Sequence, residues 1–276
     1  MKNGIITFAL TAIAVLVMSS CKVVANEDMG DVKEKIYNVG QFSSLENDGF
    51  VDVQYIPSDT FEVKLSAPEK VIERTRITVE NGTLIINQDD DDTSSRTINI
   101  GFHNNDNAKV KLYVKAPTLR SVSLTGSGDF AVKKAFNTSD FSISTTGSGD
   151  VAVSGLQCSG RLEMESEGSG DIALNNAKAV SASLNTEGSG DIALNNLEAS
   201  KVDISTSGSG DIAAVIANAG KISVDSEGSG DIVLNCSHCG DISGSTSGSG
   251  DVVVRGSAKS CSVSSSGSGD VVSAIH

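Results

Sequence analysis

The chain has 276 residues and a formal net charge of −14, so its surface repels nucleic acid and anionic lipid. This charge excludes DNA-binding and RNA-binding functions. Hydrophobic residues make up 38% of the chain, enough for a packed core, but aromatic residues make up only 4% and tryptophan is absent. A core poor in aromatic rings is typical of a thin solenoid lined by aliphatic side chains.

The N-terminus has the features of an export signal. Lys2 precedes an apolar run over residues 5–17, which is too short to span a bilayer, and Met18-Ser-Ser-Cys21 follows. The cysteine resembles the lipobox of bacterial lipoproteins, with Met18 where leucine is usual. The resemblance implies cleavage after Ser20 and a lipid on the sulfur of Cys21. The alternative is an ordinary secretory signal in which Cys21 is incidental.

The segments at this end divide by composition. We expect residues 1–20 to be a lipoprotein signal peptide and residues 21–36 to be a polar tether that holds the folded part off the membrane. The expected location is the cell envelope, as an outer membrane lipoprotein on its periplasmic or extracellular face. The lipid anchor is then the contact with the membrane.

The tetrapeptide Gly-Ser-Gly-Asp (GSGD) occurs eight times, at spacings of 19 to 21 residues. A period this regular indicates a repeat architecture. Each unit has room for two short strands and two corners but for no helix. Because every unit repeats the same alternation in the same direction, we expect parallel stacking of units rather than hairpins. The aspartates are Asp129, Asp150, Asp171, Asp191, Asp211, Asp231, Asp251 and Asp270.

Apolar residues recur at fixed places in the unit. Ile192 follows an aspartate, and Val202 and Ile204 precede the next GSG by six and four residues. Stacked parallel coils would turn these positions to a shared axis as aliphatic ladders. A further column is small throughout: Ala179, Ala199, Ala219 and Cys239. We therefore predict an all-β fold, a parallel β-helix or solenoid with coils of about 20 residues over residues 121–276.

The GSGD motif itself is interpreted as a turn device. A corner repeated in every coil needs a positive φ, which glycine adopts without a Cβ clash. The serine and the aspartate can then hydrogen-bond exposed corner amides.

Residues 37–120 lack the motif but are rich in strands. Residues 51–56 and 61–65 alternate, and Asn81-Gly82 between two apolar runs predicts a hairpin. Residues 68–72 are expected to form one helical turn. We interpret this part as β structure that caps or leads into the solenoid. Tyr55, Tyr113 and the loop of residues 89–92 are left open as a binding region.

Several stretches of this part resemble the family of putative auto-transporter adhesins with a head GIN domain. They are Phe42-Ser-Ser-Leu45, Val51-Asp-Val53, Phe61-Glu-Val63, Ala67-Pro68, Val79-Glu-Asn-Gly-Thr-Leu-Ile85 and Val114-Lys-Ala-Pro-Thr-Leu119. The resemblance covers residues 37–276 and implies a β-helix fold in a lipoprotein of Bacteroides-like bacteria. It carries over no catalytic residue, substrate or cofactor.

The stacked aspartates raise an electrostatic question. Asp171, Asp191, Asp211 and Asp231 are expected about 4.8 Å apart, where like charges repel. Corner amides, solvent or a cation can relieve this repulsion. Ca²⁺ prefers carboxylate oxygens, so a Ca²⁺ site is one hypothesis, although the spacing does not match the calcium-binding nonapeptide repeat. Otherwise no cofactor is expected. Three glutamates precede GSG and should point outward: Glu167, Glu187 and Glu227.

Four cysteines lie beyond Cys21. Cys236 and Cys239 form a CxxC around His238, and Cys239 and Cys261 fall in inward columns of adjacent coils. A buried apolar role is the first interpretation. A disulfide between Cys236 and Cys239 or between Cys239 and Cys261 is left open by export, as are redox and zinc roles. Cys158 is four coils away from Cys239, too far to be bridged.

Catalysis finds little support in this pattern. The three histidines occur in scattered contexts, and an enzyme site on a repeat scaffold should interrupt the repeat with bulky polar residues. We predict a non-enzymatic adhesin or surface-display protein that contacts a surface protein or a glycan. The alternatives are a carbohydrate-active β-helix enzyme and an envelope signalling or binding component. The last coil is expected to expose unpaired backbone groups, which favours self-association or docking on a partner.

Overall fold

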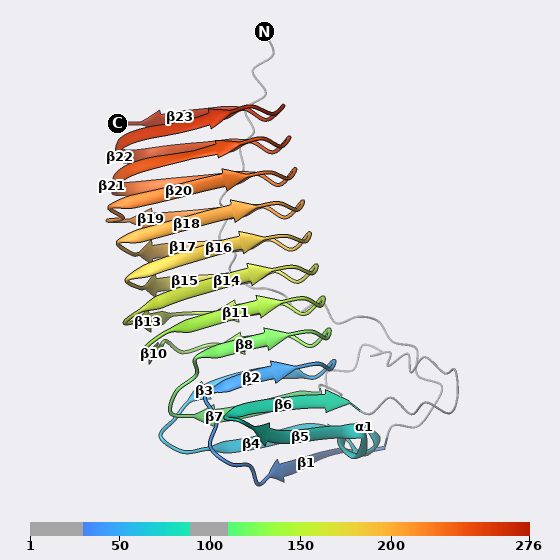
Figure 1. The fold of residues 1–276 in the computed structure, drawn as a ribbon. Coiled ribbons are helices and arrows are strands. Elements are labelled where there is room, and N and C mark those ends of the chain that lie inside the picture. Colours follow the sequence, from blue (N-terminus) through green and yellow to red (C-terminus); the bar gives the residue numbers. More distant parts are fainter. Residues whose placement is uncertain (1–29, 89–109) are drawn as a thin grey trace.

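The computed structural model describes residues 30–88 and 110–276, and within them the chain is a parallel β-solenoid with a β-rich N-terminal part (Figure 1). The predicted fold class is therefore confirmed. Coils of about 20 residues stack in parallel, each contributing one strand to a front sheet and one to a back sheet. The GSGD corners stack along one edge between the two sheets.

The front sheet runs from the N-terminal hairpin to the last coil. Its strands, in spatial order, are β5 (Thr75–Glu80), β6 (Thr83–Gln88), β2 (Ser44–Asn47), β8 (Ser121–Leu124), β11 (Phe141–Thr145), β14 (Arg161–Ser166), β16 (Ser181–Thr186), β18 (Lys201–Thr206), β20 (Lys221–Ser226) and the second halves of β21 (Ile232–Thr246) and β22 (Val252–Ser265).

The back sheet begins with three strands in antiparallel order and then continues in parallel. It contains β1 (Val32–Tyr37), β4 (Glu62–Pro68), β7 (Lys111–Ala116), β3 (Asp52–Pro57), β9 (Phe130–Val132), β12 (Val151–Val153), β15 (Ile172–Lys178), β17 (Ile192–Glu198), β19 (Ile212–Ala217), the first halves of β21 and β22, and β23 (Val271–Ile275). Two further short strands, β10 (Phe136–Thr138) and β13 (Leu156–Cys158), pair at the corner opposite GSGD.

The inward columns form the core as the period predicts. In the back sheet, Ile172, Ile192 and Ile212 lie in register and are fully buried. In the front sheet, Val202 and Ile222 are likewise in register and fully buried. The small column is also buried, as the 4% exposure of Ala199 and the 6% exposure of Cys239 show. Each fully buried aliphatic side chain stabilises the fold by about 1.5–3 kcal/mol.

The N-terminal part caps the solenoid as expected, but its chain order was not foreseen. The coil made by β2 and β3 lies between the β6–β7 layer and the β8–β9 coil. After β1, which pairs with β4 at the end of the back sheet, the chain therefore forms the β2–β3 layer before the β4–β7 layer and then passes both to reach β8. At the return, the Arg120 amide donates a hydrogen bond to the Ser43 carbonyl at 2.6 Å.

Two local predictions for this part are confirmed. The β5–β6 hairpin turns at Asn81 and Gly82, whose φ values are 50° and 78°, as a type I′ turn requires. The helical turn is α1 (Glu69–Arg74), which buries Val71. Strand β1 begins at Val32, inside the segment expected to be a tether, and pairs with β4 in antiparallel register.

Candidate functional site

The GSGD corners form the most regular surface of the molecule. In every corner after the first, the serine amide donates to the carbonyl of the first motif glycine one coil earlier, as from Ser189 to Gly168 at 2.8 Å and from Ser209 to Gly188 at 2.9 Å. Successive corners therefore stack by backbone hydrogen bonds along one edge (Figure 1).

The reason for glycine in these corners differs from the prediction. Among the described glycines, positive φ values occur at Gly30, Gly82 and Gly256 but at no glycine of a GSG motif, so the expectation of positive φ there was wrong. The glycines are needed because the corners stack without room for a side chain. A Cβ on Gly208 would press against the backbone of Glu187 and the carbonyl oxygen of Gly188.

Positive φ is used at the opposite corner instead. Asn176, Asn196, Asn218 and His238 have φ values of 51°, 64°, 59° and 54°, and Gly256 takes the same role at 99°. Asparagine tolerates this left-handed conformation better than most residues. Its side chains also form a ladder, since Asn196 Nδ2 donates to Asn176 Oδ1 at 3.1 Å.

The aspartates that follow GSG form a continuous hydrogen-bonded ladder. Each carboxylate accepts the backbone N–H of the aspartate one coil later: Asp171 from Asp191 at 2.9 Å, Asp191 from Asp211 at 2.8 Å, and Asp211 from Asp231 at 2.7 Å. The ladder begins below the repeats, because Asp52 Oδ1 accepts the amide of Asp129 at 3.3 Å. Corner amides are thus one of the expected ways in which the stacked charges are relieved.

Burial affects the first two carboxylates of the repeat. Removal from solvent raises the pKa of Asp129 and of Asp150, and the amide that each accepts opposes this rise. The predicted outward glutamates, Glu167, Glu187 and Glu227, are exposed. Within residues 30–88 and 110–276, no three His, Cys, Asp or Glu side chains form a group that could hold a metal ion. The Ca²⁺ hypothesis for the aspartates stays a prediction.

The cysteines fall in two places. Cys158 lies under the corner opposite GSGD and donates to the carbonyls of Ser139 and Arg161, each at 3.1 Å. Cys236 and Cys239 lie four coils later at the same edge, and both are buried. Cys261 is half-buried in register with Ile242. Cys21 lies outside the described residues.

The N-terminal part does not bring the two tyrosines together as a binding surface. Tyr55 is 1% exposed, and its hydroxyl donates to the Ala116 carbonyl at 2.8 Å, so it is a core residue. Tyr113 faces outward beneath the Lys64 ammonium, 5.5 Å from the ring centre. The loop of residues 89–92 lies outside the described residues.

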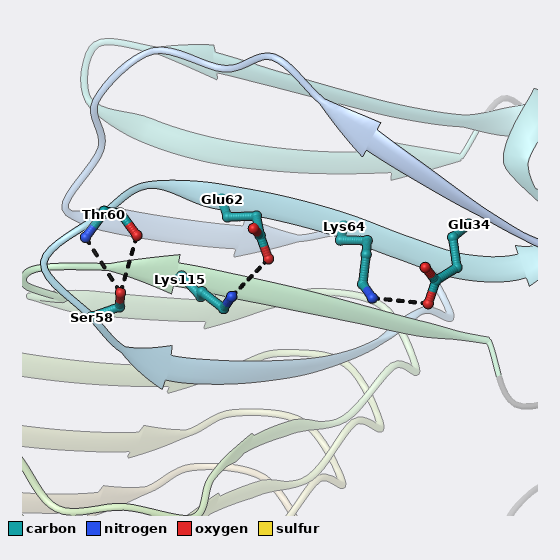
Figure 2. Close-up of polar contacts among 6 residues, drawn as sticks. All are labelled: Glu34, Ser58, Thr60, Glu62, Lys64 and Lys115. Atoms are coloured by element: carbon teal, nitrogen blue, oxygen red, sulfur yellow. Dashed lines mark hydrogen bonds and ion pairs between the residues drawn. The ribbon is translucent and has the colours of Figure 1, made fainter.

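The outer face of β1, β4 and β7 carries paired charges (Figure 2). Lys64 contacts Glu34 at 2.8 Å and Lys115 contacts Glu62 at 2.9 Å, each between neighbouring strands. The hydrogen bond from Lys115 lowers the pKa of Glu62. These pairs are partly solvent-exposed, so they fix side-chain positions on this face and contribute little to stability.

Comparison with known proteins identifies the family. The family model described as "Putative auto-transporter adhesin, head GIN domain" matches residues 41–219 and 213–273. The chain belongs to this family. No curated protein matches it. Within the described part of the chain, no helix is long and apolar enough to cross a membrane.

Solved structures share the fold of this head GIN chain. A putative adhesin from Bacteroides fragilis is 24% identical, with a TM-score of 0.67, over 87% of this chain and 96% of that one. A putative adhesin from Parabacteroides distasonis is 19% identical, with a TM-score of 0.73, over 88% and 98%. A protein from the same species titled "Putative lipid binding protein" is 23% identical, with a TM-score of 0.71, over 88% and 98%.

One element of the head GIN repeat was missed from the sequence, a column of hydroxyls two residues before seven of the eight GSG motifs, buried in every coil but the last. Ser166 Oγ donates to the Gly170 carbonyl at 3.1 Å, and Thr186 Oγ1 donates to Thr206 Oγ1 at 2.8 Å. In the β2–β3 coil, Asn47 takes this place and donates to the Val51 carbonyl at 2.9 Å. The signal was visible as a serine or threonine at the same place in seven repeats: Thr145, Ser166, Thr186, Thr206, Ser226, Thr246 and Ser265.

Proposed function

We propose that this chain is an exported cell-envelope lipoprotein, anchored through Cys21, that acts as a non-catalytic adhesin. The solenoid serves as a rigid rod that holds a repeated contact surface away from the membrane. Membership of a family described as adhesins supports this function, and the Met18-Ser-Ser-Cys21 sequence supports the anchor. The expected contact is a surface protein or a glycan.

The observation that carries the proposal is the uninterrupted repetition of the outer face. On the front sheet, one outward row keeps polar side chains in register from coil to coil: Ser121, Ser142, Glu163, Ser183, Asp203, Ser223, Ser243 and Ser262. Polar groups in register about 4.8 Å apart can make many weak contacts of similar geometry. Such contacts add up to strong attachment when they are made together.

Coil number provides the test, because whole coils can be removed in register. Deletion of residues 192–211 joins Asp191 to Ile212 and removes one 20-residue unit without changing the corner or the alternation. Cells that display the full chain should bind host or bacterial surfaces, and each deleted coil should reduce binding. Equal binding by displaying cells and cells without the chain would contradict the proposal.

The anchor is tested separately. We expect the wild-type chain to fractionate with the outer membrane and to carry a lipid mass on Cys21, and Cys21→Ser to release the chain into the soluble fraction. Cys158→Ser is the matched control, because this cysteine lies inside the solenoid. A Cys21→Ser variant that stays in the membrane fraction would contradict anchoring through Cys21.

A free strand edge supports self-association as a further contact. Among the described strands, β23 pairs with β22 alone, and Val272 on β23 is 48% exposed. An unpaired strand edge is a template for another strand. We expect dimers in sedimentation at high protein concentration and monomers for Val272→Lys. A wild-type chain that is monomeric at every concentration would exclude this contact.

A further inference from the structure

The corner between the two halves of β21 has an unusual composition. His238 turns the chain at φ 54°, as Asn218 does at φ 59° one coil earlier. In the earlier coil the residues that flank the turn inward are Ile216 and Ala219, both buried. In β21 the same two inward positions hold Cys236 and Cys239.

The corner places both thiols just beneath the surface. Cys236 and Cys239 are each 6% exposed, while Ser237 and His238 between them are exposed. Only the short corner therefore separates the sulfur atoms from solvent. Cys239 Sγ lies 3.6 Å from the Ile216 carbonyl oxygen and 3.8 Å from the Ser237 carbonyl oxygen, and the Cys236 thiol is placed as a hydrogen-bond donor to Cys239.

The two thiols are made unequal by this contact. The hydrogen bond from Cys236 lowers the pKa of Cys239 to about 6, helped by backbone groups of Ala219 and Ser237 and by His238. The same contact, together with burial, raises the pKa of Cys236. Burial also raises the pKa of Cys158, which occupies the column of Cys239 four coils earlier. Of the two thiols at this corner, Cys239 is thus the one that loses its proton more readily.

We propose that Cys236 and Cys239 form a dithiol site that reacts by thiol–disulfide exchange with an exported oxidant that carries a disulfide. The product is a Cys236–Cys239 disulfide across the corner. The Cys239 thiolate attacks one sulfur of the oxidant disulfide and expels the other as a thiolate, leaving a mixed disulfide. Cys236 then loses its proton, attacks the Cys239 sulfur and expels the second oxidant thiolate. The site loses two electrons and two protons, and the oxidant disulfide becomes two thiols.

The register decides which pair can close. Cys239 lies beside Ala258 in β22, whereas Cys261 lies three residues further along, beside Ile242. Three residues of a strand span about 10 Å, which exceeds the Cα separation that a disulfide tolerates. The pair within the corner needs no such movement, because both side chains are buried on either side of the same two-residue turn.

Peptide mapping of the exported chain tests the site. The chain is purified in detergent, reduced, incubated with oxidised glutathione at pH 7, acid-quenched and alkylated. We expect the peptide with Cys236 and Cys239 to be two hydrogen atoms lighter and unalkylated, while Cys158 and Cys261 are alkylated. If all four are alkylated after prolonged incubation, or if Cys158 or Cys261 reacts first, the proposal is wrong.

Two serine variants identify the attacking sulfur. Cys236→Ser keeps a hydroxyl donor beside Cys239, so it should accumulate glutathione on Cys239 as a trapped mixed disulfide. Cys239→Ser should react with glutathione at least tenfold more slowly, and Cys158→Ser should behave as the wild type does. Faster reaction of Cys239→Ser than of Cys236→Ser would reverse the assigned roles and overturn the mechanism. The wild-type peptide map tests the disulfide proposal even if a variant fails to fold. Its result does not depend on whether the chain acts as an adhesin.

Discussion

Replacement of Gly208 by alanine tests why the corners contain glycine. The three atoms nearest to the new Cβ are the carbonyl oxygens of Gly188 and Glu187 and the carbonyl carbon of Glu187, all of them backbone atoms closer than van der Waals contact allows. A backbone that is hydrogen-bonded to the next corner can yield only by separating two coils. Overpacking of this kind costs about 1–3 kcal/mol.

An opposing effect comes from the unfolded chain, which has less conformational entropy with alanine than with glycine. This difference favours the folded state of the variant by about 0.4–1 kcal/mol. We therefore expect Gly208→Ala to lower the free energy of unfolding by about 1–2 kcal/mol. In a domain of this size that corresponds to a Tm lower by about 2–8 °C. Circular dichroism during heating and during urea titration measures both quantities.

Gly220→Ala is the matched control, because this glycine lies at the opposite corner. Its new Cβ would meet only the Ser200 carbonyl oxygen, at 3.4 Å, and its φ is not in the left-handed region. We expect the control to be unchanged or slightly more stable. If Gly208→Ala is as stable as Gly220→Ala, crowding between corners is not the reason for the glycines.

Three further predictions concern the ladder and the core. Asp211→Ala should lower the free energy of unfolding by about 1 kcal/mol, because the Asp231 amide loses its acceptor. Asp211→Asn keeps an acceptor oxygen and should lower this free energy by less in the same urea titration. Equal losses for the two variants would show that the hydrogen bond is unimportant. If amides alone relieve the repulsion, EDTA should leave the Tm unchanged; a lower Tm in EDTA would instead support Ca²⁺ on the aspartates. Burial raises the pKa of Tyr55 to about 12, so the contribution of the neutral Tyr55 side chain to stability is complete below pH 10 and declines as pH rises towards 12. Tyr55→Phe should weaken this decline when the free energy of unfolding is measured against pH. An identical pH profile for the variant would contradict the raised pKa of Tyr55.

The repeat could be predicted because its information is local and recurs. Ile192 and Ile204 occupy inward positions of a period-2 alternation, and a 20-residue period brings equivalent positions into register. A one-residue slip would turn each aliphatic column to solvent. The sequence pattern therefore sufficed for the parallel coils and their core.

The corners show where this reasoning stops. A glycine that permits positive φ and a glycine that makes room for a neighbouring coil look the same in a sequence. At Gly208 the second reason applies, and it depends on the Gly188 carbonyl one coil away. The residues in the left-handed conformation are instead Asn176, Asn196 and Asn218 at the opposite corner.

The sequence by itself determined the coil period, the inward columns and the hairpin at Asn81-Gly82, because each follows from neighbouring residues and steric preferences. Only the tertiary structure decided that the β2–β3 coil lies between later layers, that Tyr55 is buried, and that Cys239 lies beside Ala258 rather than Cys261. These outcomes depend on which distant strands pair and in which register. That choice is made by packing of the whole chain and leaves no local pattern.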